Sequence, residues 1–529
     1  MSDLILYNAQ IHTMDSPRPT AHAIAIHDNK IVALGEEQFM RRLLPYANAI
    51  DLHNRCVIPG LIDAHMHFEW TALGLKNIDA ETPTLDELLQ RIEERVKVTP
   101  VGHWIGGHGW NQNVWGGAFP TKHDLDRVAP EHPVFLTAKS GHAGWANSLA
   151  LKIAGITAST PNPPNGEIVR DKDGEPTGVF LEDTVELVMK GMPEISAHEL
   201  ANAMRDAIPL FHRAGLTGVH DFDGARSLQA WQILKENDQL NLRVSKTIPV
   251  DLLDHAIALG IRSGFGDDWL RINSVKAFAD GALGPQTALM IDPYEGEPAS
   301  GNHGIVVTDK EVLIENVRKA STAGLSSAIH AIGDKATHDV LDVLAMARQE
   351  EGNTRLRHRI EHVQLLHPDD FNRLAQLNII ASMQPIHATS DMLIADKYWG
   401  LRRSAGAYAW RTELSAGTVL AFGSDAPVES FNPLLGIHAA VTRRRADGSP
   451  NENGWYPDQR LTVHEAVYGF TMGAAFASYD EKRKGSLTPG KLADLVVLDR
   501  DIFTIEPMDI LHAQVEATMI DGQFMWRKF

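Results

Sequence analysis

Short apolar runs of strand length alternate with amphipathic stretches of helix length through the middle of the chain. This alternation is typical of βα units, in which a buried strand is followed by a helix that covers it. Amphipathic helices are expected at Thr337–Arg348 and Pro368–Leu377, among others. The eight candidate strands are Val57–Asp63, Leu216–Phe222, Arg243–Lys246, Ile272–Phe278, Ser326–Ala331, His358–Val363, Ile379–Gln384 and Val419–Ser424. Eight such strands favour a (β/α)8 barrel over an open sheet.

The interval between the first and second of these strands is far too long for a single crossover. Residues from about 70 to 210 are therefore predicted to form an inserted subdomain. Within it, Thr84-Leu-Asp-Glu87 has the pattern of a capping box that opens a helix running to Val96. Strand-like segments follow at Trp104–Gly107 and Val134–Thr137.

Both ends of the chain are rich in β-forming residues and turn signals. Asp28-Asn29 and Asp521-Gly522 are the turns expected within these ends. The strand-like segments are Leu4–Asn8, Ala23–His27 and Lys30–Leu34 at one end, and Ala493–Asp499, Gln514–Ile520 and Gln523–Trp526 at the other. We expect residues 1–56 and 485–529 to build one small β-sandwich, which brings the termini together, beside a barrel at 57–484.

The composition is that of a globular protein with a substantial core, because hydrophobic residues make up 43% and charged residues 22%. The net charge of −19 argues against nonspecific nucleic-acid binding and against docking on an anionic membrane. The single cysteine, Cys56, excludes an intramolecular disulfide framework and a cysteine-rich zinc module. With neither a signal peptide nor an apolar run of membrane-spanning length in the sequence, a cytoplasmic location is expected.

Groups that can bind metal or exchange protons fall at the ends of the predicted strands. His65 and His67 follow the first strand, and residues i and i+2 of an extended chain point to the same side, so both imidazoles can converge on one ion. The carboxyl ends of barrel strands are also where barrel enzymes place their active sites. The other groups at such ends are Lys276 in the fourth strand, His330 in the fifth, His362 in the sixth and Asp425 after the eighth.

Each of these residues, taken singly, has a structural explanation. A lone His-x-His recurs by chance, Lys276 could be a paired structural lysine, and Asp425 could cap a turn. A nonmetal alternative, in which the histidines form a hydrogen-bonded core, predicts no bound metal and no loss of activity with a chelator. A catalytically inactive scaffold is a remote alternative, and the intact set argues against it. The joint occurrence at matching strand ends favours a metal-dependent active site.

The sequence resembles the amidohydrolase superfamily, specifically the amidohydrolase-3 branch that includes N-substituted formamide deformylases. The order and spacing of the matching blocks carry the resemblance, which covers nearly the whole chain. Two segments, Gly284-Pro-Gln-Thr287 and Trp110-Asn111, depart from the residues that are common in the family, and neither change removes a metal ligand. The matching blocks are Leu4–Asp15, Pro59–His67, Gly109–Gln112, Gly141–Asn147, Lys276–Gly284, His330–Asp334, Glu361-His362, Gly423–Glu429 and Gly485–Leu498.

The resemblance implies one or two metal ions and a modified lysine. Lys276 would be carboxylated by carbon dioxide, and its carbamate would bridge the two ions. Imidazole and oxygen ligands suit Zn²⁺ best, with manganese, cobalt and iron as alternatives. Relatives also lead us to expect a homo-oligomer, a dimer. The implied ligand sets are His65, His67 and Asp425 for one ion, and His330 and His362 for the second.

We therefore expect hydrolysis of a non-peptide or small amide C–N bond in a small-molecule substrate, by attack of metal-bound hydroxide. Asp425 would act as general base and then as general acid, and His142 could help to polarise the substrate carbonyl. A deaminase, a lactonase or an esterase could use the same site, and product analysis would distinguish them. Candidate substrate-binding residues are His220 and Gln384 at strand ends, and Trp110, Trp115 and Trp145 in the insertion.

Overall fold

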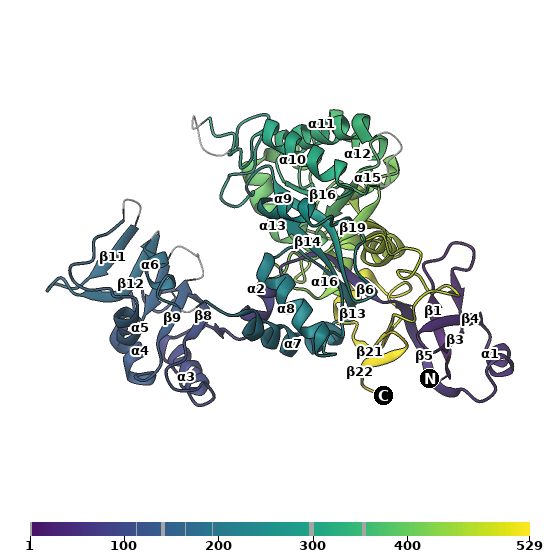
Figure 1. Cartoon of the computed structure of the whole chain (residues 1–529), viewed down its shortest axis with the longest axis horizontal. Coiled ribbons are helices and arrows are strands. Elements are labelled where there is room, and N and C mark those ends of the chain that lie inside the picture. The colour runs from purple at the N-terminus through teal and green to yellow at the C-terminus, as the bar shows by residue number, and fades with distance from the viewer. Residues whose placement is uncertain are drawn as a thin grey trace. The chain divides into compact units, whose positions relative to one another are not determined.

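The computed structural model describes residues 3–112, 114–138, 143–163, 166–182, 184–192, 194–295, 301–351 and 356–529. Its strands form three sheets (Figure 1). The chain divides into two compact units, one of residues 1–71 and 204–529 and the other of Ala72–Ala203. The second unit lies within the predicted insertion at about 70–210. Among the described residues, no helix combines the length and the apolar character needed to cross a bilayer.

Eight parallel strands make the barrel sheet of the first unit, in the order β19-β18-β17-β16-β15-β14-β13-β6. Backbone hydrogen bonds just beyond the two outermost strands of this order, β6 and β19, join them and close the barrel at that end. Asp425 N–H donates to the His65 carbonyl oxygen (2.7 Å), and His67 N–H donates to that of Ala426 (2.8 Å). The strands are β6 Leu61–Met66, β13 Leu216–Asp221, β14 Arg243–Pro249, β15 Leu270–Phe278, β16 Ser326–Ala331, β17 Arg359–His362, β18 Ile380–Met383 and β19 Leu420–Phe422.

Helices follow the barrel strands, so the βα alternation predicted from the sequence is present, and the predicted fold class is confirmed. In Figure 1, α10, α11 and α12 cover the outer side of strands such as β16. The helices of this unit are α1 Glu37–Leu43, α8 Ala225–Glu236, α9 Leu253–Ala258, α10 Lys310–Thr322, α11 Asp334–Glu351, α12 Arg373–Gln376, α13 Pro385–Tyr398, α14 Gly400–Ser404, α15 Trp410–Ala416, α16 Pro433–Thr442, α17 Val463–Tyr468 and α18 Ala474–Ala477. Helices α2 Phe68–Gly74 and α7 Ala197–Arg213 span the boundaries between the two units.

Two predicted elements differ from those observed. The run Val57–Asp63 is not one strand: its first part ends a strand of the terminal sheet, and β6 begins at Leu61. The break falls at Gly60, where a Cβ atom would collide with the side chain of Thr217, so any larger residue would force Thr217 or the chain to shift. The predicted helix Pro368–Leu377 is also divided, into a 3-10 turn at Pro368–Asp370 and α12.

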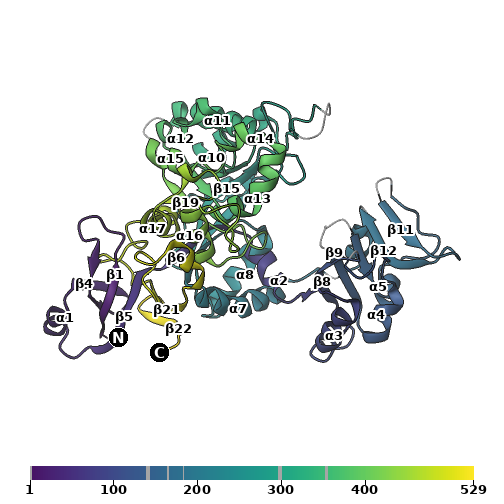
Figure 2. The same ribbon diagram turned by 180° about the vertical axis from the view of Figure 1, so that it is seen from behind.

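Strands from both ends of the chain form one composite sheet, in the order β22-β21-β20-β5-β1-β3-β4, with β2 beside β1. Figure 2 shows the purple strands of the N-terminal end and the yellow strands of the C-terminal end in the same part of the molecule. In hydrogen bonding, the expected sandwich is therefore a single sheet. Its strands are β1 Asp3–His12, β2 Thr20–Ala21, β3 Ala23–His27, β4 Lys30–Gly35, β5 Asn48–Pro59, β20 Leu495–Leu498, β21 Val515–Ile520 and β22 Gln523–Arg527.

The composite sheet packs against the end of the barrel at which the strands begin. Arg243 is the first residue of β14 and is only 1% exposed. It forms a bidentate ion pair with Asp494, with Nε–Oδ2 and Nη2–Oδ1 distances of 2.6 and 2.8 Å. A third carboxylate, that of Asp521 in the β21–β22 turn, accepts from the same guanidinium at 3.0 Å. The opposite barrel end, where the strands finish, is left for the candidate site.

The inserted unit contains a six-stranded sheet, in the order β11-β12-β10-β9-β8-β7. The predicted helix begins as expected: the Thr84 side chain accepts a hydrogen bond from Glu87 N–H and caps α3. The strands are β7 Ile78–Asp79, β8 Ile105–Trp110, β9 Val134–Ala138, β10 Ala143–Ala146, β11 Gly166–Arg170 and β12 Pro176–Glu182, and the helices are α3 Leu85–Val96, α4 Lys122–Val128, α5 Ser148–Ile153 and α6 Val185–Met189.

Candidate metal centre

The ends of five barrel strands bring the predicted ligands to one place. His65 is the penultimate residue of β6, and His67 follows that strand. The other groups lie at equivalent heights because parallel strands in register end at the same edge of a barrel. They are Lys276 near the end of β15, His330 as the penultimate residue of β16, His362 as the last residue of β17 and Asp425 shortly after β19.

Ligand atoms of three of these side chains converge. One nitrogen each of His65 and His362 and one oxygen of Asp425 all lie within 4.8 Å of one another, and the three residues are buried. Asp425 Oδ1 is 3.6 Å from His65 Nε2 and also 3.6 Å from His67 Nε2. Ligands around a tetrahedral zinc ion with bonds of about 2.0–2.1 Å are separated by roughly 3.4 Å. The spacing of these atoms thus matches that of ligands around one small cation.

The outer nitrogens of the first two histidines are held by carboxylates. His65 Nδ1 is 2.6 Å from Glu361 Oε2, and His67 Nδ1 is 3.0 Å from Asp223 Oδ1. Because a carboxylate accepts the Nδ1 proton, each Nε2 carries a lone pair. These lone pairs face the Asp425 carboxylate with no proton between them. The nitrogen and oxygen atoms therefore repel one another unless a cation lies between them. The residues present therefore fit a bound metal.

His330 and His362 lie side by side, with ring centroids 4.5 Å apart. Gln384 Oε1 accepts from His362 Nδ1 at 2.8 Å, which leaves His362 Nε2 free to bind metal. His330 Nε2 is held by the Gly281 carbonyl oxygen at 2.9 Å, so its Nδ1 remains available. Each of the four histidines is thus held through one ring nitrogen and offers the other.

Comparison with known proteins supports this interpretation of the geometry. A model described as the amidohydrolase family matches residues 48–525. The chain belongs to the amidohydrolase family. The N-substituted formamide deformylase of Arthrobacter pascens is 31% identical over all of this chain and 99% of its own length, and a putative amidohydrolase, YtcJ, of Bacillus subtilis is 34% identical over 99% of each chain. The crystal structure of an uncharacterized metal-dependent hydrolase from Pyrococcus furiosus superposes with a TM-score of 0.80 at 28% identity, covering 95% of this chain and 100% of that one.

Membership of this family and these relatives make the protein a hydrolase that acts on C–N bonds, and they support a metal cofactor. The protonation states in the amidohydrolase centre also favour cation binding. Burial holds the pKa of His65 and of His362 well below the ordinary value, and lowers that of His330 to about 3. All three imidazoles are consequently neutral near pH 7, which is the form that binds metal.

Lys276 lies among these side chains and is 4% exposed. Its Nζ is 4.9 Å from the ring centroid of Phe222 and 4.7 Å from that of Phe278. Among the described residues, no carboxylate oxygen comes within 4 Å of the nitrogen. Burial therefore lowers the pKa of Lys276 to about 8, and a fraction of the amine is neutral near pH 7.

His387, in the first turn of α13, is a site residue that the sequence analysis missed. Its Nδ1 accepts from Gln364 Nε2 at 3.2 Å, so Nε2 carries the ring proton. This buried Nε2–H has no hydrogen-bond partner among the described residues and lies 3.8 Å from Asp425 Oδ2. The signal was available, because His387 follows Gln384 by three residues just after a barrel strand, where one turn of helix reaches back to the same edge.

A buried ionic network beneath the metal ligands was also missed. Arg359 Nε donates to Glu361 Oε1, the carboxylate that holds His65. The same guanidinium donates to the Ala64 carbonyl oxygen and lies 2.9 Å from His220 Nδ1. His220, predicted as substrate-binding, is thus 1% exposed and has a structural partner in the barrel interior.

The remaining predicted residues lie in the inserted unit. Trp110 and Trp145 have no exposed surface and belong to its hydrophobic core, where Trp115 packs against them. Their indole N–H groups donate to the carbonyl oxygens of Leu136 and Thr121, which accounts for both side chains as core residues. His142 lies outside the described residues.

Proposed function

We propose that this amidohydrolase cleaves a small, non-peptide amide into a carboxylate and an amine. The observation that carries the proposal is the convergence of neutral imidazoles and the Asp425 carboxylate on one point at the carboxyl ends of the barrel strands. Such a set of nitrogen and oxygen ligands suits zinc. The similarity to N-substituted formamide deformylase favours amides that carry a substituent on nitrogen.

In the proposed centre, the strand-end residues would hold one or two metal ions, and Lys276 would be a further ligand. When bound, the metal lowers the pKa of a water molecule to near neutrality and supplies the nucleophile. Lys276 reacts through its neutral amine with carbon dioxide, forming a carbamate and releasing one proton. The low pKa of the buried amine supports this step, because an ammonium group cannot react. The ligands would be His65, His67 and Asp425 for one ion, and His330 and His362 for the other.

Asp425 would move the proton. Its Oδ1 faces His65 and His67, whereas Oδ2 points toward His387 and is free to take a proton. Burial raises the pKa of Asp425 to about 6, close enough to neutrality for the group to accept a proton and give it up again. The proton would pass to the nitrogen of the substrate as the C–N bond breaks, so that a neutral amine leaves.

His387 would bind the substrate carbonyl. Its unpaired Nε2–H is a hydrogen-bond donor directed at the reacting region, and the Gln384 side-chain N–H₂, also buried and unpaired among the described residues, lies at the same strand end. Fixed donors of this kind stabilise the negative charge that grows on a carbonyl oxygen as a nucleophile adds. Both groups are neutral, so they suit an uncharged amide.

The test is a panel of N-substituted formamides and small aryl amides, with esters, lactones and amino-heterocycles of similar size, assayed on the zinc-loaded protein. Release of equal amounts of amine and carboxylate supports the proposal, whereas ammonia or an alcohol as the only product replaces it with a deaminase or an esterase. Asp425→Asn should lower kcat by about 10²–10⁴-fold at unchanged circular dichroism. Wild-type turnover by pure, metal-loaded Asp425→Asn would remove Asp425 from the proposed role.

A further inference from the structure

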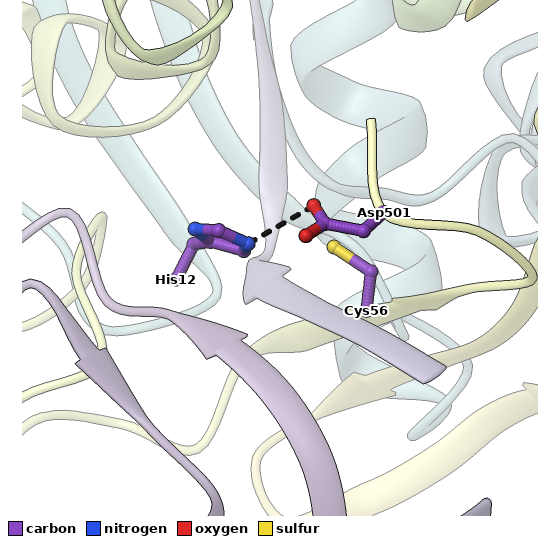
Figure 3. Close-up of side chains that lie close together, drawn as sticks. All are labelled: His12, Cys56 and Asp501. Atoms are coloured by element: carbon purple, nitrogen blue, oxygen red, sulfur yellow. Dashed lines mark hydrogen bonds and ion pairs between the residues drawn. The ribbon is translucent and has the colours of Figure 1, made fainter. Parts of the chain in front are cut away.

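A second group of metal-compatible side chains lies in the composite terminal sheet, apart from the candidate metal centre. It consists of His12, Cys56 and Asp501 (Figure 3). A nitrogen, the sulfur and a carboxylate oxygen of these residues all lie within 4.8 Å of one another. In the described part of the chain, this spacing is met only by this group and by the His65–His362–Asp425 group.

The register of the sheet explains why residues so far apart in sequence meet. Strand β5 lies between β1 and β20, and Cys56 is paired with Gln10 on one side and Leu498 on the other. His12 is two residues beyond Gln10 and therefore on the same face of the sheet, and Asp501 follows the end of β20. Three segments, two from one end of the chain and one from the other, thus contribute one ligand each.

Contacts around the group fix the orientation of two of its members. The His12 ring is stacked on Phe503 at a centroid distance of 3.8 Å, and His12 Nε2 lies 3.0 Å from Asp501 Oδ1. Phe503 N–H donates to the same Asp501 oxygen at 3.1 Å. The two Phe503 contacts come from outside the group and hold His12 and Asp501 in place, so little freedom remains to be lost on binding. A bound cation would replace the hydrogen bond between His12 and Asp501.

Access and charge also suit a cation. Cys56 is completely buried, whereas the side chains of His12 and Asp501 are 18% and 9% exposed, so the group opens to solvent on one side. A dication bound to one thiolate, one carboxylate and a neutral imidazole would leave this buried position with no net charge.

We propose that His12, Cys56 and Asp501 form a second metal site, which binds a borderline-soft divalent cation such as Zn²⁺. On binding, the thiol proton leaves to solvent, a sulfur–metal bond forms, and no oxidation state changes. A water molecule would complete the coordination on the open side. Thiolate and imidazole ligands disfavour magnesium and calcium. The bound ion would tie the first strand, the strand that leads into the barrel, and the C-terminal segment together.

The experiment uses Co²⁺ as the probe, because cobalt bound to a thiolate gives a charge-transfer absorption in the near ultraviolet. Cys56 is the only cysteine in the chain, so any such band reports this site alone, and the His65–His362–Asp425 group has no sulfur to contribute. Metal-free full-length protein is titrated with Co²⁺. We expect a band that saturates at one equivalent per chain and that Zn²⁺ displaces.

Variants assign the ligands. Cys56→Ser should abolish the band and lower the bound zinc by one equivalent, and His12→Gln or Asp501→Asn should weaken cobalt binding at least about 100-fold. His53→Gln, which alters an exposed histidine on the same strand, and His362→Gln, which alters the other group, should leave the band unchanged. Absence of a band in folded wild-type protein at saturating Co²⁺, or wild-type affinity in both His12→Gln and Asp501→Asn, would overturn the proposal. Neither outcome depends on the hydrolase activity.

Discussion

The four histidines of the metal centre differ in the group that holds their second nitrogen. Carboxylates hold His65 and His67, whereas an amide oxygen holds His362 and a backbone carbonyl holds His330. A carboxylate partner makes an imidazole a more basic and better oriented ligand than a neutral partner does. The two halves of the centre therefore differ in their hydrogen bonding, and we expect the side that includes Asp425 to bind a cation more tightly.

His387→Phe tests the donor that faces Asp425. Phenylalanine fills the same space but removes the Nε2–H, so the growing charge on the substrate oxygen loses one hydrogen bond. We expect kcat to fall by about 10²–10³-fold with little change in KM, measured on the best substrate of the panel. Zinc content should stay at the wild-type value, because His387 is not among the proposed ligands.

The control for this prediction is His387→Gln, which keeps an amide donor at a similar position and should recover part of kcat. A role in packing alone predicts the opposite order, since phenylalanine preserves the ring shape better than glutamine does. Equal kcat in His387→Phe and the wild type, at equal zinc content, would remove His387 from the mechanism.

At the residue scale, sequence patterns reveal candidate ligands at strand ends and miss the side chains on neighbouring strands that hold these ligands in place. His65, His330 and His362 were visible because each closes an apolar run. Asp223 was not, because its role comes from a hydrogen bond to His67, a residue 156 positions away. A pairing of this kind depends on the lateral order of strands, which the spacing along one strand does not contain.

Among the elements, the contact between the last and the first barrel strands, β19 and β6, is the most sensitive to an added methyl group. A Cβ atom on Gly423 would collide with the backbone nitrogen of His65 and with a carboxylate oxygen of Asp63. Backbone atoms cannot turn aside as a side chain can. Gly423→Ala should therefore push β6 and the end of β19 apart, costing about 1–3 kcal/mol of unfolding free energy.

The same substitution should weaken zinc binding, because His65 and Asp425 lie on the two sides of this join. Thermal unfolding and competitive chelator titration measure the two effects. Gly284→Ala is the matched control, since a Cβ atom at Gly284 meets no atom within 4 Å. Gly423→Ala with unchanged stability and unchanged zinc affinity would show that the join is not tightly packed.

Helix α15 contains a buried acid whose ionisation should make stability depend on pH. Glu413 has no exposed surface, and within the described residues only the Thr418 hydroxyl bonds its carboxyl group. Burial raises its pKa from 4.5 to about 7. The contribution of Glu413 to the free energy of unfolding is therefore fully present below about pH 4.5, where the group is protonated in both states. It is lost as the pH rises through about 7, by an amount on the order of 3 kcal/mol.

Glu413→Gln cannot ionise and should lack this dependence. We compare the melting temperatures of the variant and the wild type from about pH 5 to about pH 8. The two should converge or cross as the pH rises, because only the wild type is destabilised by a buried charge. Parallel curves over that range would mean that Glu413 titrates in the folded protein as it does in the unfolded chain.

The elements themselves were largely predictable. All eight barrel strands appear near their expected positions, because a strand buried on both faces reads as a continuous apolar run. The exception at Val57–Asp63 has the same cause. The strands on the two sides of Gly60 are both buried, so hydrophobicity alone marks no boundary between the terminal sheet and the barrel.

For the whole molecule, the sequence indicated that the two ends of the chain combine and that a long insertion interrupts the barrel. What it could not supply was the partner of each buried side chain. Trp110 and Trp145 were expected to bind substrate, yet each is enclosed by the hydrophobic core of the inserted unit. Aromatic residues have the same signature in a core and in a binding site, and only three-dimensional packing separates the two.

Arg243, whose charge is buried at the base of β14, forms an ionic contact between the composite sheet and the barrel. Asp494→Ala should lower the free energy of unfolding by about 3–5 kcal/mol, because it leaves most of that charge unpaired in a dry interior. Asp521→Ala is the control: its carboxylate is 28% exposed and contacts the guanidinium through one oxygen, so the loss should be much smaller. Chemical denaturation of both variants measures the difference. If Asp494→Ala costs no more than Asp521→Ala, the Arg243–Asp494 pair does not hold the sheet to the barrel.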